Sequence, residues 1–240
     1  MKARYDEIYH DIRRKIETGT YGYQSYLPSE AVLTDLYACS HSTVRRAIAV
    51  LRDNGYVQPV HGKGVRVTYS KPERASFSIG GIESFDEVRR RSGFSSATRV
   101  VRFERIEATP NIAEHTGFNV GDDLIFIERV REINGEALIL DQNLFLAKVA
   151  EGLTPDIAAG SIYQYLEEDL GITIVMSKRE ITGERASDQD RALLDLGDID
   201  YVIVVRNQTF DTQGTMIECT QSRHRLDHFC FRDTAVRKGV

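Results

Sequence analysis

The chain has 240 residues, of which 41% are hydrophobic and 28% are charged. That length suffices for two modest domains or one large one, and the composition is ordinary for a soluble globular protein. No apolar run is long enough to span a bilayer and no basic-then-apolar leader opens the sequence, so we expect a cytoplasmic protein with no membrane partner. Three widely spaced cysteines, Cys39, Cys219 and Cys230, argue against a disulfide framework and fit a reducing compartment.

The charge is distributed unevenly along the chain, whose net charge is −5. Residues 1–70 carry 10 Lys and Arg against 7 Asp and Glu, whereas the remainder carries 21 against 29. Within residues 39–67, five basic side chains and two histidines accompany a single acid, Asp53. This asymmetry indicates that the first part of the chain meets a polyanion, although solvated surface is the simpler explanation for a charge block alone.

Helical patterns come first in the chain. Apolar residues at helical spacing predict a helix from about Tyr5 to Ile16. Ser29 and Ser40 are good N-caps for two further helices. The third helix has apolar residues at i, i+3, i+4 and i+7, namely Val44, Ala47, Ile48 and Leu51.

A β-hairpin is predicted next. Residues 56–60 and 65–69 alternate as two short strands, and the loop between them contains Gly62 and Gly64, where positive φ is needed. Three helices followed by a hairpin make a winged helix-turn-helix, and the short turn between the second and third helices is typical of that motif. We therefore predict a winged helix-turn-helix DNA-binding domain over residues 1–70.

The rest of the chain predicts a second domain rich in strands. Residues 71–90 are expected to form a linker and the first effector-domain segment, because residues 68–82 have the polar composition of a linker. Residues 91–240 then form an α+β domain on a largely antiparallel sheet. The predicted strands are 97–108, 124–133, 136–145, 172–184, 201–210 and 216–225, and the predicted helices are 112–117, 161–170 and 187–196.

The exposed face of the third helix carries groups suited to DNA. A rotation of about 100° per residue puts Ser42, Arg45 and Arg46 opposite the apolar stripe. Arginines there can reach guanine edges or phosphates, and Lys63 at the hairpin tip can enter the minor groove. Two arginines on an exposed helix are more often merely solvated, but the helix-turn-helix context favours DNA binding. The predicted DNA-binding set is Ser29, Glu30, Ser40, His41, Ser42, Thr43, Arg45, Arg46, His61, Gly62, Lys63 and Gly64.

Arg129 and Arg131 indicate an anion site in the second domain. They lie two apart on a predicted strand, so both side chains share a face with isoleucines such as Ile127. Unpaired burial of two guanidinium groups would be costly, and either a phosphate or acids on a neighbouring strand would satisfy them. Ser161, a predicted N-cap, and Tyr163 offer a second anion cradle, with simple capping as the alternative.

The sequence contains no recognisable catalytic or metal motif. His224 and His228 have a metal-like i, i+4 spacing, but the predicted strand end separates them and no third ligand is evident. Neither a Gly-rich nucleotide loop nor a nucleophile elbow is present. We therefore expect no metal, no cofactor and no enzyme activity.

Two stretches of sequence resemble a known family. The first is LPSEAVLTDLYACSHSTVRRAIAVLRDNGYVQPVHGKGVRV, which resembles the DNA-binding domain of the GntR family of bacterial transcription regulators; the match covers residues 5–68. His41 stands where the family usually has arginine, and Arg46 stands where glutamine is frequent. The second domain, through RVREINGEALILDQNLF and GTMIECTQSRHRLDHFCF, resembles the effector-binding (UTRA) domain of the HutC subgroup, whose fold is chorismate-lyase-like.

The resemblance implies a one-component repressor that acts as a homodimer on double-stranded operator DNA. The stretches FSIGGIESFDEVRRR and SRHRLDHF are most similar to repressors of trehalose operons, which implies trehalose 6-phosphate as the effector. Another metabolite, such as an amino sugar phosphate, a histidine-pathway compound or a phosphonate, is the alternative. An enzyme is the third hypothesis, because the second domain's fold resembles a lyase.

The resemblance also implies an effector site. Asp141 and Glu218 match acids that accept sugar hydroxyl groups in the subgroup, and they are equally suited to pair with the arginines. His224 stands where many relatives have tyrosine, and Ser84 is a candidate phosphate donor. The implied effector-binding residues are Ser84, Arg129, Arg131, Asp141, Ser161, Tyr163, Glu218 and His224.

Overall fold

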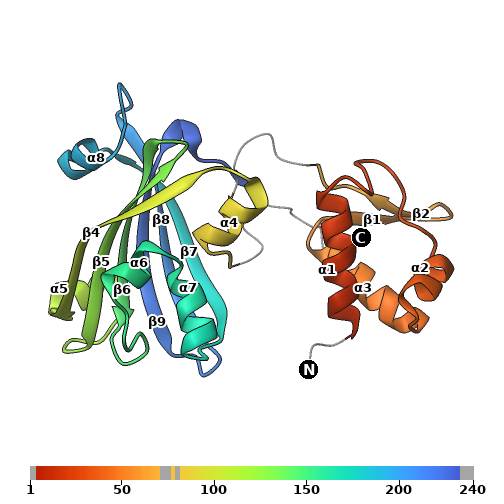
Figure 1. The fold of residues 1–240 in the computed structure, drawn as a ribbon, viewed down its shortest axis with the longest axis horizontal. Helices are drawn as coiled ribbons and strands as arrows, with labels where there is room; N and C mark the ends of the chain where they lie inside the picture. The colour runs from red at the N-terminus through yellow and green to blue at the C-terminus, as the bar shows by residue number, and fades with distance from the viewer. Residues whose placement is uncertain (1–3, 71–76, 79–81, 233–240) are drawn as a thin grey trace. The chain divides into compact units, whose positions relative to one another are not determined.

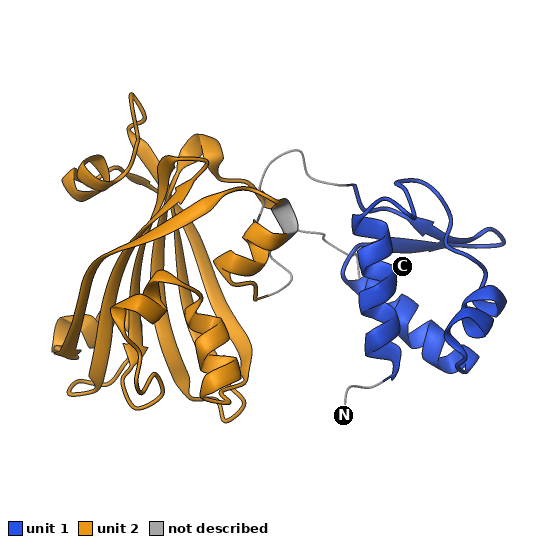
Figure 2. Ribbon diagram, in the orientation of Figure 1, with its two compact units in different colours: residues 1–73, 233–240 blue, residues 74–232 orange. Residues whose placement is uncertain are grey.

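The computed structural model describes residues 4–70, 77–78 and 82–232. The chain divides into two compact units, with Met1–Glu73 in the first and Arg74–Arg232 in the second (Figure 2). Residues 71–76 and 79–81 of the predicted linker, and 233–240 of the predicted effector domain, lie outside the described residues. Among the helices that are described, none is long and apolar enough to cross a membrane.

The described residues of the first unit form three helices and a β-hairpin. One apolar cluster joins the buried face of the first helix to the predicted stripe of the third, including Ile12 and Leu51. Ser29 and Ser40 accept hydrogen bonds from the backbone N–H groups of Val32 and Thr43, so both act as the predicted N-caps. The elements are α1 (Arg4–Glu17), α2 (Glu30–Tyr37), α3 (His41–Asp53), β1 (Val57–Val60) and β2 (Gly64–Val67).

The second unit is built on a six-stranded antiparallel sheet with the order β4-β5-β6-β9-β8-β7 (Figure 1). Asn134 and Gly135 connect β5 to β6, and both have positive φ, as a two-residue hairpin requires. Each predicted strand agrees with the structure to within two residues, and the predicted α+β fold class is confirmed. The strands are β4 (Ser96–Glu107), β5 (Asp123–Ile133), β6 (Glu136–Leu146), β7 (Ile174–Arg185), β8 (Tyr201–Asp211) and β9 (Met216–Arg225).

Different helices cover the two faces of this sheet. On the face that carries Ile127 and Phe145, α6 (Pro155–Ala159) and α7 (Ile162–Gln164) lie across the strands, and α7 continues as a π-helix over Tyr165–Asp169 (Figure 1). We call this the inner face. On the outer face, α5 (Pro110–Thr116) packs near Leu124, and residues directly after α8 (Asp188–Leu193) pack against the far end of the same strands. The inner face carries the cavity described below.

Several described segments were not predicted, among them α6, the 3-10 helix at Leu226–His228, Phe77–Ser78 and Phe85–Ser92. Phe77–Ser78, inside the predicted linker, forms β3 and pairs in parallel with β10 (Phe231–Arg232). Phe85–Ser92 forms helix α4, which Ser84 and Glu87 begin with a capping box. Its sequence has apolar residues only at Phe85 and Val88, too few for a periodic signal, so this helix depends on its cap and on burial of Val88.

A buried ion pair fastens α8 to the outer face. Asp190 is fully buried, and its two carboxylate oxygens share the N–H of Arg223 Nε in a bifurcated hydrogen bond, at 2.8 and 3.0 Å. Arg223 also donates to Glu184 at 2.8 Å. Burial alone would raise the pKa of Asp190, but hydrogen bonds from Arg223 and Ser187 outweigh it and lower the pKa. The carboxylate is therefore ionised and holds α8 on β9.

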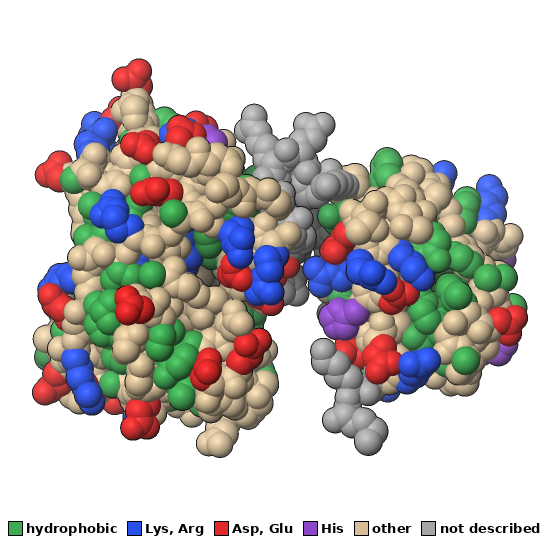
Figure 3. Space-filling model, viewed as in Figure 1, with side chains coloured by type: hydrophobic (Ala, Val, Ile, Leu, Met, Phe, Trp, Pro, Cys, Tyr) green, Lys and Arg blue, Asp and Glu red, His purple; other side chains and the backbone are tan. Residues whose placement is uncertain are grey.

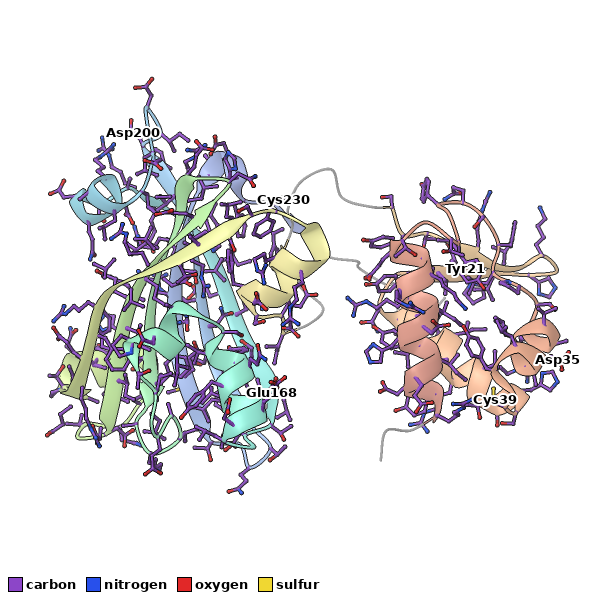
Figure 4. All side chains as sticks on the ribbon, in the orientation of Figure 1. Tyr21, Asp35, Cys39, Glu168, Asp200 and Cys230 are labelled. Atoms are coloured by element: carbon purple, nitrogen blue, oxygen red, sulfur yellow. The ribbon has the colours of Figure 1, made fainter. Side chains whose placement is uncertain are left out.

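The substitution Asp190→Asn is expected to lower the free energy of unfolding of the second unit by about 3 kcal/mol, because it removes one partner of a buried charge. Urea denaturation followed by circular dichroism measures the change. Asp200, labelled in Figure 4, accepts a surface hydrogen bond from Arg191 at 2.6 Å and provides the control. Asp200→Asn should cost less than about 1 kcal/mol. Equal losses in the two variants would contradict the assigned role of Asp190.

Candidate functional site

The exposed face of α3 presents two arginines that other side chains hold in place. Arg45, whose side chain is 70% exposed, donates from Nε to Glu30 of α2 at 2.8 Å. The guanidinium carbon of Arg46 lies 4.0 Å from the ring centroid of Tyr5 on α1, a cation–π contact. Both arginines lie opposite the buried stripe, and both are oriented at the surface by neighbouring helices.

Hydroxyl groups cluster at the start of α3. Ser40 Oγ lies 2.8 Å from Ser42 Oγ and 2.9 Å from Thr43 Oγ1. His41, the first residue of α3, has Nδ1 at 3.3 Å from Thr34 Oγ1. A helix start with free N–H groups and several hydroxyls can bind an anion such as a DNA phosphate.

The tip of the β1–β2 hairpin is exposed and contains His61, Gly62, Lys63 and Gly64. The two glycines have φ of +72° and +103°, so a side chain at either position would be strained. Sequence reasoning missed the support of this hairpin by Tyr26, whose ring centroid lies 5.6 Å from the guanidinium carbon of Arg66. Tyr26 is distant in sequence from β2, so no local pattern could have indicated the contact.

Basic charge in the first unit is interspersed with acid. On the face that Figure 3 shows, Lys and Arg side chains lie beside Asp and Glu side chains, in agreement with the ion pairs along α1. Positive charge for DNA must therefore come from particular positions, of which α3 and the hairpin tip are the candidates.

The second unit contains a cavity over the inner face of its sheet. Its empty volume is about 1030 Å³, counted out to the open mouth. Every residue of the predicted effector set lines it: Ser84, Arg129, Arg131, Asp141, Ser161, Tyr163, Glu218 and His224.

Strand register explains why residues so far apart in sequence meet in this cavity. Arg129 on β5 lies opposite Asp141 on β6, and Asp141 lies opposite Ser222 on β9. In the next row on the same face, Arg131 lies opposite Ile139, and Ile139 lies opposite His224. Directly opposed residues of antiparallel strands project from the same face, so these rows form the cavity floor.

The two arginines have different partners. Arg131 donates from Nε to Asp141 at 2.5 Å, and its guanidinium carbon lies 4.3 Å from the ring centroid of Phe85. Arg129 donates to the carbonyl oxygen of Ala158 at 3.0 Å and to Asn143 Oδ1 at 2.9 Å. The buried Nε of Arg129 has no hydrogen-bond partner among the described residues. Both arginines therefore form ion pairs with Asp141 of the neighbouring strand, Arg131 through a hydrogen bond and Arg129 at 3.8 Å, and Arg129 keeps one donor to spare.

The charges of this group are strongly coupled. Burial and the nearby Arg131 lower the pKa of Arg129, so the site disfavours a second positive charge. Burial would raise the pKa of Asp141, but Arg131 and Arg129 outweigh it and bring the pKa to about 2. Asp141 is thus ionised at neutral pH, 3.8 Å from Arg129 and closer to Arg131. Glu218 is a second carboxylate that acts on Arg129, so the two guanidinium groups face two acids in this cavity.

Glu218 takes part in a hydrogen-bond network. It accepts from the Tyr163 hydroxyl at 2.6 Å and from Asn143 Nδ2 at 3.0 Å, and also from Thr220. Burial, together with the charge of Glu218, raises the pKa of Tyr163 well above its usual value, so the phenol stays protonated. Of the two predicted acids, Asp141 is therefore an ion-pair partner of the arginines and Glu218 is a hydrogen-bond acceptor.

Ser161 and Ser84 both begin helices at the cavity. Ser161 Oγ accepts from the N–H of Gln164 at 3.3 Å, as predicted for an N-cap. Ser84 Oγ accepts from the N–H of Glu87 at 3.2 Å. Each hydroxyl accepts a capping bond and keeps its own proton to donate to a ligand.

Several cavity residues were missed from the sequence. Asn143, Thr220 and Ser222 follow the same every-second-residue alternation as the predicted acids, so that pattern could have found them. Arg179 on β7, which donates from Nε to Asn207 at 3.0 Å, lies on a strand whose place in the sheet the sequence does not reveal. Three aromatic residues also line the cavity, and no local sequence pattern indicated that they would: Phe85, Phe229 and Phe231.

The two histidines with metal-like spacing are separated, because His224 is buried on β9 whereas His228 is exposed in the short 3-10 helix after that strand. Within the described part of the chain, no group of three or more His, Cys, Asp or Glu side chains is arranged to hold a metal ion.

Sequence families match both units. Residues 4–67 match the family described as bacterial regulatory proteins, gntR family, and residues 91–230 match the UTRA domain. The HTH-type transcriptional regulator TreR of Bacillus subtilis (strain 168) is 40% identical over 230 residues, which cover 96% of each chain. The repressor NagR of the same strain is 25% identical over 227 residues, which cover 95% of this chain and 92% of NagR.

Solved structures share the fold. The TreR effector binding domain of B. subtilis is 39% identical to this chain, with a TM-score of 0.55, over 60% of this chain and 99% of that domain. The possible transcriptional regulator YydK of B. subtilis subsp. subtilis str. 168 has a TM-score of 0.81 at 21% identity, over 98% of this chain and all of that one. The expected family is thereby confirmed: the chain belongs to the GntR family of bacterial transcription regulators, in which a helix-turn-helix domain here precedes a UTRA domain.

Proposed function

We propose that this regulator represses genes for trehalose uptake and use, and that trehalose 6-phosphate in the cavity releases it from its operator in the bacterial cytoplasm. TreR of B. subtilis is a trehalose repressor, and the 40% identity of this chain to it over 96% of both chains supports the trehalose assignment. The observation that carries the phosphate assignment is Arg129, whose buried Nε has no hydrogen-bond partner among the described residues.

On the DNA, two copies would insert α3 into successive major grooves, about 34 Å apart. Arg45 and Arg46 would reach base edges or phosphates, while the hydroxyls of Ser40, Ser42 and Thr43 would hold backbone phosphates and set the register. The flanking contacts would come from Ser29, Glu30 and His41, and from the hairpin tip at His61, Gly62, Lys63 and Gly64. Lys63 would supply the charge for the minor groove.

In the cavity, the phosphate would lie against Arg129 and Arg131, with hydroxyl donors from Ser84 and Ser161. Tyr163, whose proton is donated to Glu218, would orient that carboxylate toward the sugar. A phosphate would bond to the spare donor of Arg129 and to Arg131, and these charge-assisted hydrogen bonds would offset its repulsion by Asp141 and Glu218. Sugar hydroxyl groups would donate to the acceptors Asp141 and Glu218, and His224 would bind the polar end of the sugar.

Effector binding and DNA binding must then oppose each other through a single coupling free energy. If trehalose 6-phosphate weakens operator binding by some factor, operator DNA weakens effector binding by the same factor. The proposal includes a homodimer. When two DNA-binding units are linked, a change in the distance between their α3 helices changes the affinity for the operator.

A regulator of another phosphorylated sugar, such as an amino sugar phosphate, is the second candidate. Arginines recognise the phosphate and not the sugar, so the anion end of the cavity suits both ligands. Fluorescence anisotropy of an operator fragment separates them, since release by glucosamine 6-phosphate and not by trehalose 6-phosphate would refute the trehalose assignment.

Arg129→Gln is expected to weaken trehalose 6-phosphate binding by about a hundredfold while leaving operator binding unchanged, because a buried charged donor is lost. The glutamine can still bond to Asn143, which limits damage to the fold. Titration calorimetry measures the first effect and operator anisotropy the second. Arg102→Gln, on the opposite face of the same sheet, is the matched control and should bind effector normally. Loss of operator binding in the Arg129 variant would contradict the separation of roles.

Arg45→Ala and Lys63→Ala are each expected to weaken operator binding and to reduce the slope of log K against log salt by about 1, because each removes a cationic contact with DNA. The readout is operator affinity measured at several salt concentrations. Arg14→Ala removes an exposed arginine of α1 in the same unit and serves as control. If the Arg14 variant changes the slope as much as the other two, α3 and the hairpin tip are not the DNA surface.

His224 is expected to make the fold sensitive to acid. Burial lowers its pKa from 6.5 to about 4, so between these values the unfolded chain binds more protons and stability falls as the pH falls. Between pH 6.5 and pH 4, the free energy of unfolding should fall by a few kcal/mol more in the wild type than in His224→Gln. Urea denaturation across that range tests this. Above pH 7 the two curves should run parallel, and a parallel course at all pH values would refute the effect.

A further inference from the structure

The cavity has a second end whose chemistry differs from that of the arginine floor. Phe229 and Phe231, which we call the aromatic wall, are half-buried there, and their ring centroids lie 6.1 Å apart with 9° between the ring planes. His224 touches this wall, with its centroid 4.8 Å from that of Phe229. On the other side, the guanidinium carbon of Arg179 lies 5.9 Å from the centroid of Phe231.

The aromatic wall extends from the middle of the sheet toward its β7 edge. Phe229 contacts His224 on β9, two strands from Arg129 on β5, and Phe231 contacts Arg179 on β7. The backbones of β5 and β7 are four strand spacings apart, roughly 19 Å along the sheet. A single hexose ring with its phosphate on Arg129 covers only part of this width, whereas a two-ring ligand extends further toward Phe231.

The groups at this far end suit an uncharged sugar ring. A pyranose has an apolar face of C–H groups, which packs on aromatic rings, and a rim of hydroxyl groups that need polar partners. Phe229 and Phe231 provide two nearly parallel rings, while Asn207 and Ser177 line the same end of the cavity with hydrogen-bonding groups. An aromatic surface beside a few polar groups is the usual composition of a site that orients one ligand.

We infer that Phe229 and Phe231 form the subsite for a second sugar ring, and that the cavity thereby selects disaccharide phosphates over monosaccharide phosphates. This inference rests on the proposed function, because it takes the phosphate to lie at Arg129. The phosphate end provides the charge-dependent affinity common to all sugar phosphates, and the aromatic wall provides the additional affinity that only a two-ring ligand can use.

The test is titration calorimetry of the full chain with trehalose 6-phosphate, sucrose 6-phosphate and glucose 6-phosphate. Phe229→Ala and Phe231→Ala should each weaken binding of the preferred disaccharide phosphate by about tenfold, the effect of losing one buried aromatic contact, and leave glucose 6-phosphate binding unchanged. Phe231→Leu, which keeps apolar volume, guards against misfolding and should show a smaller loss in the same direction. Phe126→Ala is the matched control, since Phe126 is half-buried beneath Arg102 on the outer face.

Two results would overturn the inference. One is a wild-type protein that binds neither disaccharide phosphate more tightly than glucose 6-phosphate. The other is an equal loss of glucose 6-phosphate and disaccharide phosphate binding in the wall variants. If sucrose 6-phosphate binds most tightly and depends on the wall, the subsite stands and the trehalose assignment fails. If Arg129→Gln leaves all three affinities unchanged, the phosphate position fails and the inference falls with it.

Discussion

The organisation of the second unit depends on two guanidinium groups buried side by side that share one carboxylate. Charge in a protein interior is tolerated only where neighbouring dipoles and counter-charges replace water. Asp141 supplies the counter-charge. The carbonyl oxygen of Ala158, near the end of α6, accepts a hydrogen bond from Arg129. The inner face can therefore not be an apolar core throughout. Its apolar cluster lies around Phe145 and α7, and the remaining surface stays open as a cavity lined by polar groups.

The same residue type serves two opposite purposes in this chain. In the first unit, Glu30 and Tyr5 hold Arg45 and Arg46 at the surface, where water screens their charge and long polyanions have access. In the second unit, Arg129 is buried. Its attraction to a single small anion is stronger there than at the surface, because the protein interior screens charge less than water does. Exposure favours an extended and salt-sensitive partner, whereas burial favours a small and chemically defined one. On the proposed function, the different placement of these arginines accounts for DNA binding by the first unit and effector binding by the second.

Much of this fold was readable from the sequence, because long alternating strands and capped amphipathic helices leave strong periodic signals. The same alternation put Arg129 and Arg131 on one face, and it would have added Asn143 had it been applied to β6. What the sequence could not supply is the strand order, since the central pairing of β6 with β9 joins segments about 75 residues apart. Arg179 and the aromatic wall reach the cavity only through that order. Helix α4 was missed for a different reason, because its eight residues are mostly charged and a capping box rather than an apolar stripe begins it.

The pairing of β6 with β9 also determines the order in which the two units can fold during synthesis. The three helices and hairpin of the first unit contact one another within residues 4–70, so they can fold as soon as that stretch leaves the ribosome. The metabolite site needs β9 and Phe231, which emerge on the order of 10 s after Arg129 at about 10 residues per second. A nascent chain therefore completes its helix-turn-helix unit well before the cavity of the second unit can form.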